Sequence, residues 1–388
     1  GFGQFNINGN RDRSNNYMLD GTDNNDPFFN NSALNQVGIT GAPATLLPLD
    51  AIQEFNLQAQ FGAEYGRNSG SAVNIITRSG ANQFHGSVYE YNRNSAYDAR
   101  NYFDTSPAPQ SRFNNNNYGA SLGGPVVRDK TFFFFAYEGQ RERVGSDFAL
   151  AVPSKQNIMD ARALALNNPF FTVPAINPAL DKIVAFFPTS DTNSLAASVR
   201  DQNDNNNLIA KIDHRLSDKF MLTGRYAFGQ SDQVFPLGSL GGFGSGSRLA
   251  AFAQQSPTRV QVVSLSLLDT VSATRLNELR FGYSRFRTGF TSADSSGPNT
   301  IDPAALGLDL GTGKVGLPEI DFNGDLENLG ATAFSVPRGR VSQTFQILDN
   351  FTWVRGRHTI KFGGEYHRYN VNSFNDNLER GLLDVNPT

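Results

Sequence analysis

Residues 66–86, which read GRNSGSAVNIITRSGANQFHG, join two strand-like segments of different kinds. The first, VNIIT at 73–77, is short, β-prone and enclosed by glycine and serine. The second starts almost at once as FHGSVYEYNR and is longer and rich in tyrosine. We therefore predict that a small domain ends at residue 81 and that a domain with longer strands begins at residue 82.

The first 81 residues consist of short β-prone pieces separated by turns. FNING, YMLDG and VNIITRSG each place a glycine just after an extended piece, where a positive φ is least costly. LPLDAIQEFNLQAQ predicts a short helical turn after Pro48, followed by a strand. Because these pieces are too short for a sandwich, we predict a small mixed α/β domain at 1–81.

Nine longer strands are predicted downstream, several of them close to the 9–11 residues with which a tilted strand crosses a hydrocarbon layer. They lie at 84–93, 116–124, 131–141, 207–216, 219–229, 259–271, 275–288, 341–354 and 358–370. Apolar and polar side chains alternate along the later strands. One face carries Leu208, Ile212, Leu216, Phe220, Leu222, Tyr226, Phe228, Leu279, Phe281, Tyr283, Ile360, Phe362 and Tyr366. The other carries Lys211, Asp213, Arg215, Thr223, Arg225, Glu278, Arg280, Ser284, Lys361, Glu365 and His367.

This alternation alone fits either a soluble sandwich, with the apolar face inward, or a membrane barrel, with that face toward lipid. The connections between the strands favour the barrel, because short and long ones alternate. The short connections are 125–130, 217–218, 272–274 and 355–357, and the long ones lie near 94–115, 142–206, 230–258 and 289–340. Short turns at one rim and long extracellular loops at the other are typical of outer-membrane barrels, so we predict a transmembrane β-barrel at 82–388.

The composition excludes several classes of protein. The 388-residue chain has a mean hydropathy of −0.39 and no apolar run long enough for a transmembrane helix. A net charge of −3 without a basic stripe argues against nucleic acid as a partner. The chain has no cysteine, so it has no disulfide and no thiolate metal site. Because it starts without Met, and because bacterial barrels have even strand counts, we expect a fragment whose barrel does not close.

Two segments in and beside the long loops predict further local structure. Ser154 is placed to cap a helix through IMDARALAL, and PALDKIVAFF predicts a second amphipathic helix. The run TFFFFAY at 131–137 is bounded by charged residues, so it predicts a strand with phenylalanine on both faces. Such a run in water would be prone to aggregate, which favours lipid on one face and a packed domain on the other.

Three segments resemble the plug-to-barrel region of TonB-dependent outer-membrane receptors, most closely the Oar-like branch. They are YMLDGTDNNDP, IQEFNLQAQFGAEYGRNSGSAVNIITRSGANQFHGSVYEYNRN and GGPVVRDKTFFFFAYEG, and the resemblance runs from about residue 6 to 141. It implies a plug domain, truncated here at its N-terminus, that fills a barrel of about 22 strands, of which this chain supplies about nine. It also implies that the TonB complex pulls on the plug, although the TonB-contacting segment is not among these 388 residues.

From the resemblance we expect the plug motifs and the seam between plug and barrel to include Asp20, Gly21, Glu64, Tyr65, Gly66, Arg67, Gly70, Asn74, Thr77, Gly80, His85 and Gly86. Within AEYGRNSG, at 63–70, our hypothesis is that Glu64 and Arg67 face the barrel wall and hold the plug by charge pairing. The alternative is a solvated turn with a surface ion pair worth less than about 1 kcal/mol.

Metal and enzyme sites have little support in the sequence. DGTDNND resembles the start of a calcium loop, but the positions that need glycine and glutamate are Asn25 and Asn31, so an Asx-rich turn is the better interpretation. His85, His214 and His358 belong to no zinc motif, nor does His367. His367 lies on the polar face of a predicted strand, where it could line a lumen, but we favour the interpretation of an ordinary strand residue. GGFGSGS at 241–247 lacks the Lys-Ser/Thr of a phosphate loop. We therefore expect neither enzymatic activity nor a cofactor.

The predicted function is TonB-energised uptake of a bulky substrate across the cell outer membrane. Binding at the outer loops and plug would be followed by movement of the plug. The expected partners are the TonB complex, outer-membrane lipid and an extracellular ligand such as a siderophore, a glycan or a peptide. The main alternative is a structural or adhesive surface protein of the same fold, and a soluble all-β secreted protein is a third interpretation. Specificity lies in variable loops, so the sequence does not identify the substrate.

Overall fold

The computed structural model describes residues 6–7, 9–34, 44–100, 110–168, 175–235, 246–308, 311–333, 336–375 and 377–385. A nine-stranded antiparallel sheet dominates these residues, and each strand pairs with its neighbours in the chain. Its strands are β5 (His85–Asn94), β6 (Phe113–Val127), β7 (Thr131–Ala151), β8 (Ser194–Arg215), β9 (Phe220–Phe235), β10 (Gln254–Ser272), β11 (Arg275–Ser292), β13 (Arg338–Arg355) and β14 (His358–Asn375). All nine predicted strands are thus confirmed, and β5 and β14 are the two edges.

The predicted loop at 142–206 is wrong at both ends, because β7 and β8 continue far into it. Their extensions are rich in charged and amide side chains, which suggested a loop. In the structure they pair strand to strand, and Arg143 Nη1 lies 2.5 Å from Asp204 Oδ1. Ser146 Oγ donates to Asp201 Oδ2 at 2.5 Å. Cross-strand pairing satisfies the hydrogen-bonding groups of the backbone in these extensions, and polar side chains on the two strands can pair with one another as well.

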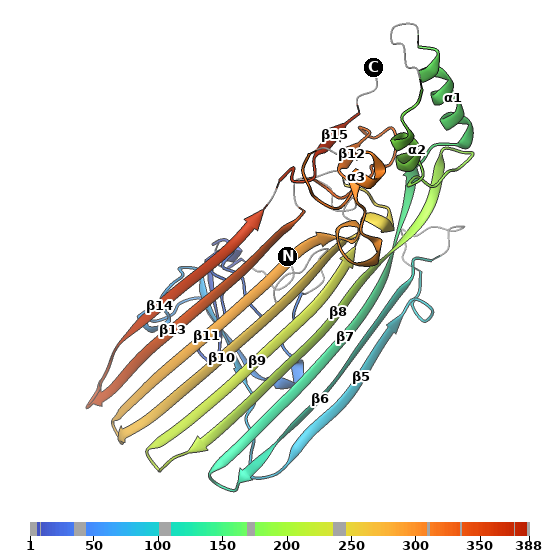
Figure 1. Cartoon of the computed structure of the whole chain (residues 1–388). Coiled ribbons are helices and arrows are strands. Elements are labelled where there is room, and N and C mark those ends of the chain that lie inside the picture. Colours follow the sequence, from blue (N-terminus) through green and yellow to red (C-terminus); the bar gives the residue numbers. More distant parts are fainter. Residues whose placement is uncertain are drawn as a thin grey trace.

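The short turns all lie at one end of the sheet and the long connections at the other (Figure 1). Part of the long connections folds into a small body with its own apolar core, formed by Ile183, Phe187, Phe252, Leu317, Ile320 and Leu329. Its elements are α1 (Lys155–Leu166), α2 (Pro178–Val184), η6 (Ala250–Phe252), η7 (Ala293–Ser295), η8 (Gly297–Asn299), α3 (Pro303–Leu306), β12 (Glu319–Asp321) and β15 (Leu382–Asp384). We call it the loop body.

Both predicted loop helices are present, as α1 and α2, and Ser154 caps α1 in a capping box with Asn157. No helix in the described part of the chain is long and apolar enough to cross a membrane. The glycine-serine segment predicted at 241–247 lies outside the described residues except at 246–247.

The N-terminal part forms a separate four-stranded sheet in the order β2-β1-β4-β3, with β1 parallel to β4. Its elements are η1 (Asp12–Ser14), β1 (Asn15–Leu19), β2 (Thr22–Asp23), η3 (Leu49–Ala51), β3 (Ile52–Gln58), η4 (Ala63–Tyr65) and β4 (Ser71–Thr77). The predicted turn after Pro48 is η3, and the helical content described here consists of 3-10 helices. The predicted boundary at 81 falls between β4 and β5. We call this N-terminal part the plug.

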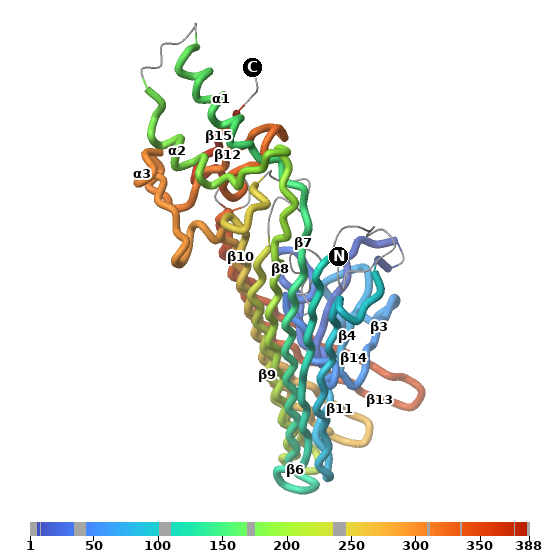
Figure 2. The backbone as a smooth tube through the Cα atoms, turned by 90° about the vertical axis from the view of Figure 1, so that its right-hand side faces the viewer, coloured from blue at the N-terminus to red at the C-terminus, as the bar shows by residue number. Residues whose placement is uncertain are grey.

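The plug lies against one face of the nine-stranded sheet (Figure 2). A single apolar cluster joins the two, with Leu19, Ala33, Leu34, Leu47 and Ala51 from the plug and Phe134, Ala136, Ile209, Ala227, Val260, Val262 and Phe286 from the strands. On the opposite face, large apolar side chains are exposed, among them Leu122, Ile212, Leu265, Leu279, Ile347, Phe362 and Tyr366. Among the described residues no second layer covers that face, so the sheet is not half of a sandwich.

The four phenylalanines of TFFFFAY show both faces within one strand. Phe134 is 2% exposed and belongs to the apolar cluster with the plug, whereas the next residue, Phe135, is 40% exposed on the outward face. The predicted placement of phenylalanine on both faces is therefore confirmed.

We expect Phe134→Ala to destabilise the full-length protein in detergent by about 3–5 kcal/mol, the usual cost of truncating a buried phenylalanine. The matched control, Phe135→Ala, should change the unfolding free energy much less, since it empties no packed site. Guanidinium unfolding followed by heat-modifiable gel mobility measures both. Equal losses for the two variants would contradict the assignment of faces.

Candidate functional site

The contact between plug and sheet is centred on the tip of the β1–β2 hairpin. Leu19 pairs with Thr22, and the two residues between them, Asp20 and Gly21, both have positive φ, of 47° and 71°. Asp-Gly in this conformation is the favoured two-residue hairpin turn. A Cβ at Gly21 would meet the guanidinium at the flexible end of Arg280, and the positive φ of 71° would strain any other residue, so the φ is the main reason for glycine here.

The Asp20 carboxylate joins the hairpin tip to one strand of each sheet. It accepts hydrogen bonds from Thr77 N at 2.7 Å and Thr77 Oγ1 at 2.6 Å, on β4, and it pairs with Arg225 Nη1 on β9 at 2.5 Å. Arg225 also donates to Leu19 O at 2.7 Å, and its side chain is fully buried. Burial acts to raise the pKa of Asp20, but the charges of Arg225 and Lys211 and the Thr77 hydrogen bonds outweigh it, so the pKa is below its usual value.

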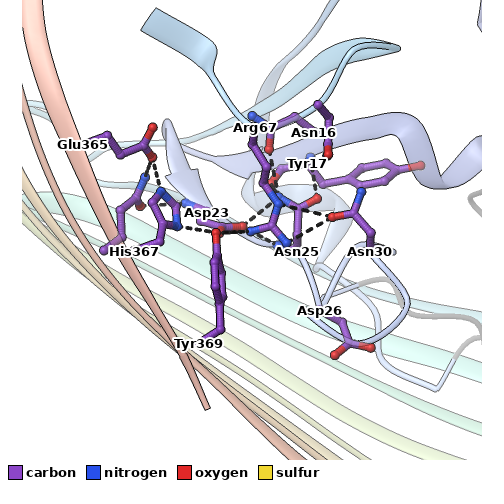
Figure 3. A network of polar contacts seen from close by, with 12 residues as sticks. Asn16, Tyr17, Asp23, Asn25, Asp26, Asn30, Arg67, Glu365, His367 and Tyr369 are labelled. Carbon is purple, nitrogen blue, oxygen red and sulfur yellow. Dashed lines mark hydrogen bonds and ion pairs between the residues drawn. The ribbon is translucent and has the colours of Figure 1, made fainter. Parts of the chain in front are cut away.

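A second polar group lies around Asp23 (Figure 3). Arg67 Nη1 is 2.7 Å from Asp23 Oδ2 and 2.8 Å from the Tyr369 hydroxyl on β14. His367 Nδ1 approaches Asp23 Oδ2 to 3.2 Å, and its other ring nitrogen contacts Glu365. His367 also lines the cavity between the plug and the strands, so the structure favours the alternative of a lumen-lining residue over that of an ordinary strand residue. Burial acts to raise the pKa of Asp23, but the close approach of the His367 ring and the charge of Arg67 lower it further than burial raises it.

Two further ion pairs connect the plug to β13 and β14. Asp26 Oδ2 lies 2.7 Å from Arg340 Nη2, and both side chains are buried. Glu64 Oε1 lies 2.7 Å from Lys361 Nζ in a largely exposed pair. Glu64 and Arg67 thus do not pair with each other, and each makes its own contact with β14.

The remaining predicted residues fall into three places. Gly21 N donates to Asn74 Oδ1 at 2.8 Å, so Asn74 belongs to the hairpin tip. Tyr65, Gly66 and Gly70 shape the turn that carries Glu64 and Arg67, and Tyr65 O accepts from Asn16 Nδ2 at 2.8 Å. Gly80, His85 and Gly86 lie apart from the charged contacts, at the entry to β5. Gly80 and Gly86 pack there against the backbones of β6 and β7, and the ring centroid of His85 lies 6.5 Å from that of Phe134.

Sequence reasoning missed most partners of these residues. They are Asp23, Asp26, Lys211, Arg225, Arg280, Arg340, His367 and Tyr369. A signal was present, because charged residues stood on the polar faces of the predicted strands and DGTDNND repeats an acid at every third position. That segment forms Asx turns, with Asn25 N donating to Asp23 Oδ1 at 2.8 Å. In the described residues no group of three or more His, Asp or Glu side chains is placed to hold a metal.

A cavity of about 830 Å³ lies between the plug and strands β11, β13 and β14. Charges of both signs line it: Asp20, Asp23, Glu64, Arg67, Glu278, Arg280, Lys361, Glu365 and His367. The cavity is therefore large and polar enough to hold water and polar solutes beside the plug.

Comparison with known proteins agrees with this arrangement. The profile of the outer membrane beta barrel domain matches residues 76–388. The chain belongs to the outer-membrane β-barrel family. It is therefore an outer-membrane protein, and the exposed apolar face of the sheet is the face that lipid covers.

The relatives are transporters and receptors. The chain is 33% identical over 137 residues to the TonB-dependent transporter Oar of Myxococcus xanthus, a match that covers 34% of this chain and 12% of Oar. Its fold matches the outer membrane transporter YddB from Escherichia coli, with a TM-score of 0.53 and 11% identity, over 94% of this chain and 41% of YddB. The fold also matches that of the ferric enterobactin receptor PfeA (mutant G324V) from Pseudomonas aeruginosa, with a TM-score of 0.51 and 13% identity. This match covers 95% of this chain and 43% of PfeA. The chain spans less than half the length of each relative.

These matches agree with the resemblance to TonB-dependent receptors of the Oar-like branch. The mainly β fold is confirmed, and its nine-stranded sheet does not close into a barrel within the described residues. The relatives are not enzymes, in agreement with the absence of a catalytic motif from the sequence.

The buried pair Asp26–Arg340 and the more exposed pair Glu64–Lys361 should contribute differently to the free energy of unfolding. We expect Arg340→Met to destabilise the full-length protein by about 3–5 kcal/mol, because it leaves Asp26 buried without its partner. Lys361→Met should cost at most about 1 kcal/mol, since the pair with Glu64 is solvated. Guanidinium unfolding measures both, and the Asp26→Asn/Arg340→Met double variant should recover part of the loss. Equal effects at the two sites would contradict the assigned burial.

Stability should also depend on pH through Asp20. Its pKa is lower in the folded protein, so it contributes stability above the unfolded value of about 3.9 and loses that contribution as pH falls through it toward the folded pKa. We expect the melting temperature to drop below about pH 4, and to drop less in Asp20→Asn. Parallel pH profiles for the two proteins would show that Asp20 is not responsible.

Proposed function

We propose that this protein takes up a bulky substrate across the outer membrane with energy from the TonB complex. The substrate would bind at the long connections and the plug, and the plug would then move. The observation that carries the proposal is the plug, a separate sheet that lies on the inward face of the strands and is joined to them partly through charged contacts. Hydrogen bonds and ion pairs of this kind exchange with water at modest net cost, unlike a continuous apolar core.

The arrangement of the connections supports an outward orientation for the loop body. In outer-membrane barrels the short turns face the periplasm and the long loops face the medium. By this rule α1, α2 and α3 lie outside the cell, where a substrate arrives. The loop body has its own apolar core, so it can hold binding side chains in fixed positions.

The size and chemistry of the substrate stay open within this proposal. Barrels of about 22 strands enclose a lumen that a plug fills, which suits a solute larger than those that pass through porins. PfeA is named for ferric enterobactin, but at 13% identity the likeness concerns the fold alone. Iron chelates, glycans and peptides therefore remain candidates.

Deletion of the full-length gene tests the proposal. Growth of the deletion strain is compared with that of the parent on ferric chelates, cobalamin, glycans and peptides, each supplied as the limiting nutrient. We expect a defect on one nutrient, the same defect after deletion of the TonB complex, and rescue by the intact gene. Normal growth on every nutrient, together with altered cell adhesion or surface organisation, would favour the structural role.

A further inference from the structure

The plug contacts the sheet in two different ways on its two sides. Toward β7–β10 the contact is mainly apolar and closely packed, and Phe134, Ile209, Ala227 and Val260 of the strands are all buried in it. Arg225 and Lys211 also bind the plug on this side, as buried charged side chains. Toward β11, β13 and β14 the plug touches the strands through polar and charged groups, including the buried Asp26–Arg340 pair, and the polar cavity described above lies beside these contacts. The same small domain is thus held mainly by an apolar patch on one side and by a polar seam beside a cavity on the other.

The seam carries groups that water can solvate when the plug moves away. Gly21 O accepts from Arg280 Nη1 at 2.6 Å, and Asp23 N donates to Gln346 Oε1 at 2.9 Å. Arg280 Nε has no hydrogen-bond partner among the described residues. Breaking such contacts beside a polar cavity that water can enter exchanges them for contacts with water. Breaking the apolar patch would instead expose hydrocarbon to water without any compensating bond.

We propose that the plug separates from the wall first along β11, β13 and β14, while the patch on β7–β10 stays closed as a pivot. The cavity between β1–β2 and these three strands then widens into the passage for a hydrophilic substrate. This deepens the proposed uptake function and rests on it, because it states on which side of the plug that substrate crosses. The charges of both signs along the cavity suit a polar solute and would oppose an apolar one.

Two close contacts, one on each side, allow a matched test. On the seam side, a Cβ built on Gly282 of β11 would lie 2.5 Å from Thr22 Cγ2. On the patch side, a Cβ built on Gly229 of β9 would lie 2.9 Å from Thr45 Cβ. Both pairs are a threonine of the plug against a glycine of the wall, at distances that a disulfide can bridge after small shifts. The chain has no native cysteine, so each engineered pair would form the only disulfide within it.

The full-length variants Thr22→Cys/Gly282→Cys and Thr45→Cys/Gly229→Cys are purified, oxidised and placed in planar lipid bilayers. KCl conductance is recorded over a series of urea concentrations below global unfolding. Wild type and the oxidised Thr45→Cys/Gly229→Cys variant should open at similar urea concentrations. Oxidised Thr22→Cys/Gly282→Cys should open at least tenfold less often, and reduction should restore opening. Mass spectrometry verifies each disulfide, and the single-cysteine variants report any effect on folding.

The inference is overturned if both disulfides block opening, if neither does, or if only the Thr45→Cys/Gly229→Cys disulfide does. It is also overturned if the wild-type protein never conducts. Because the assay needs neither TonB nor the natural substrate, its result is independent of the growth test of uptake.

Should the paired variants fail to fold, maleimide labelling of single cysteines replaces them. Met18→Cys, which lines the cavity, should label at least tenfold faster in mild urea than Ala51→Cys, which lies in the patch. The reverse order would equally overturn it.

Discussion

The contact between Asp20 and Arg225 links the two parts of the molecule at its most constrained point. Arg225 is fully buried on the inward face of β9, and such a charge is tolerated only with a close counter-charge. Asp20 supplies it from a hairpin tip whose conformation requires the neighbouring glycine, and Thr77 fixes the same carboxylate to the centre of the plug sheet. The placement of the plug on the wall therefore depends on this tip.

Around that point the two faces of the nine-stranded sheet meet different surroundings. The outward face is apolar because lipid cannot hydrogen-bond, and the inward face mixes apolar patches with charged and amide side chains because it meets a protein domain and water. The carboxylates Asp20, Asp23, Asp26 and Glu64 of the plug each find a cationic partner. The plug is thus joined to the wall both by one apolar cluster and by the charged contacts around it, and the charged contacts fix which residues meet.

Much of the architecture followed from local patterns. Period-two alternation separated the apolar and polar faces of the later strands, and the alternation of short and long connections favoured a barrel with the apolar faces outward. The resemblance singled out Asp20, Gly21, Asn74 and Thr77, which the structure brings together at the hairpin tip. The extensions of β7 and β8 were missed, since their polar sequences resemble loops and only pairing with a neighbour makes them strands.

By itself, then, the sequence determined the strands, the faces they present and the class of membrane protein, because these depend on neighbours a few residues apart. Only the tertiary structure decided which wall residue meets which plug carboxylate. Asp26 and Arg340 are 314 positions apart in the chain, and no local pattern joins them. The tertiary structure also placed His367 beside Asp23 and left the cavity on one side of the plug, since both depend on where a separately folded sheet docks on the wall.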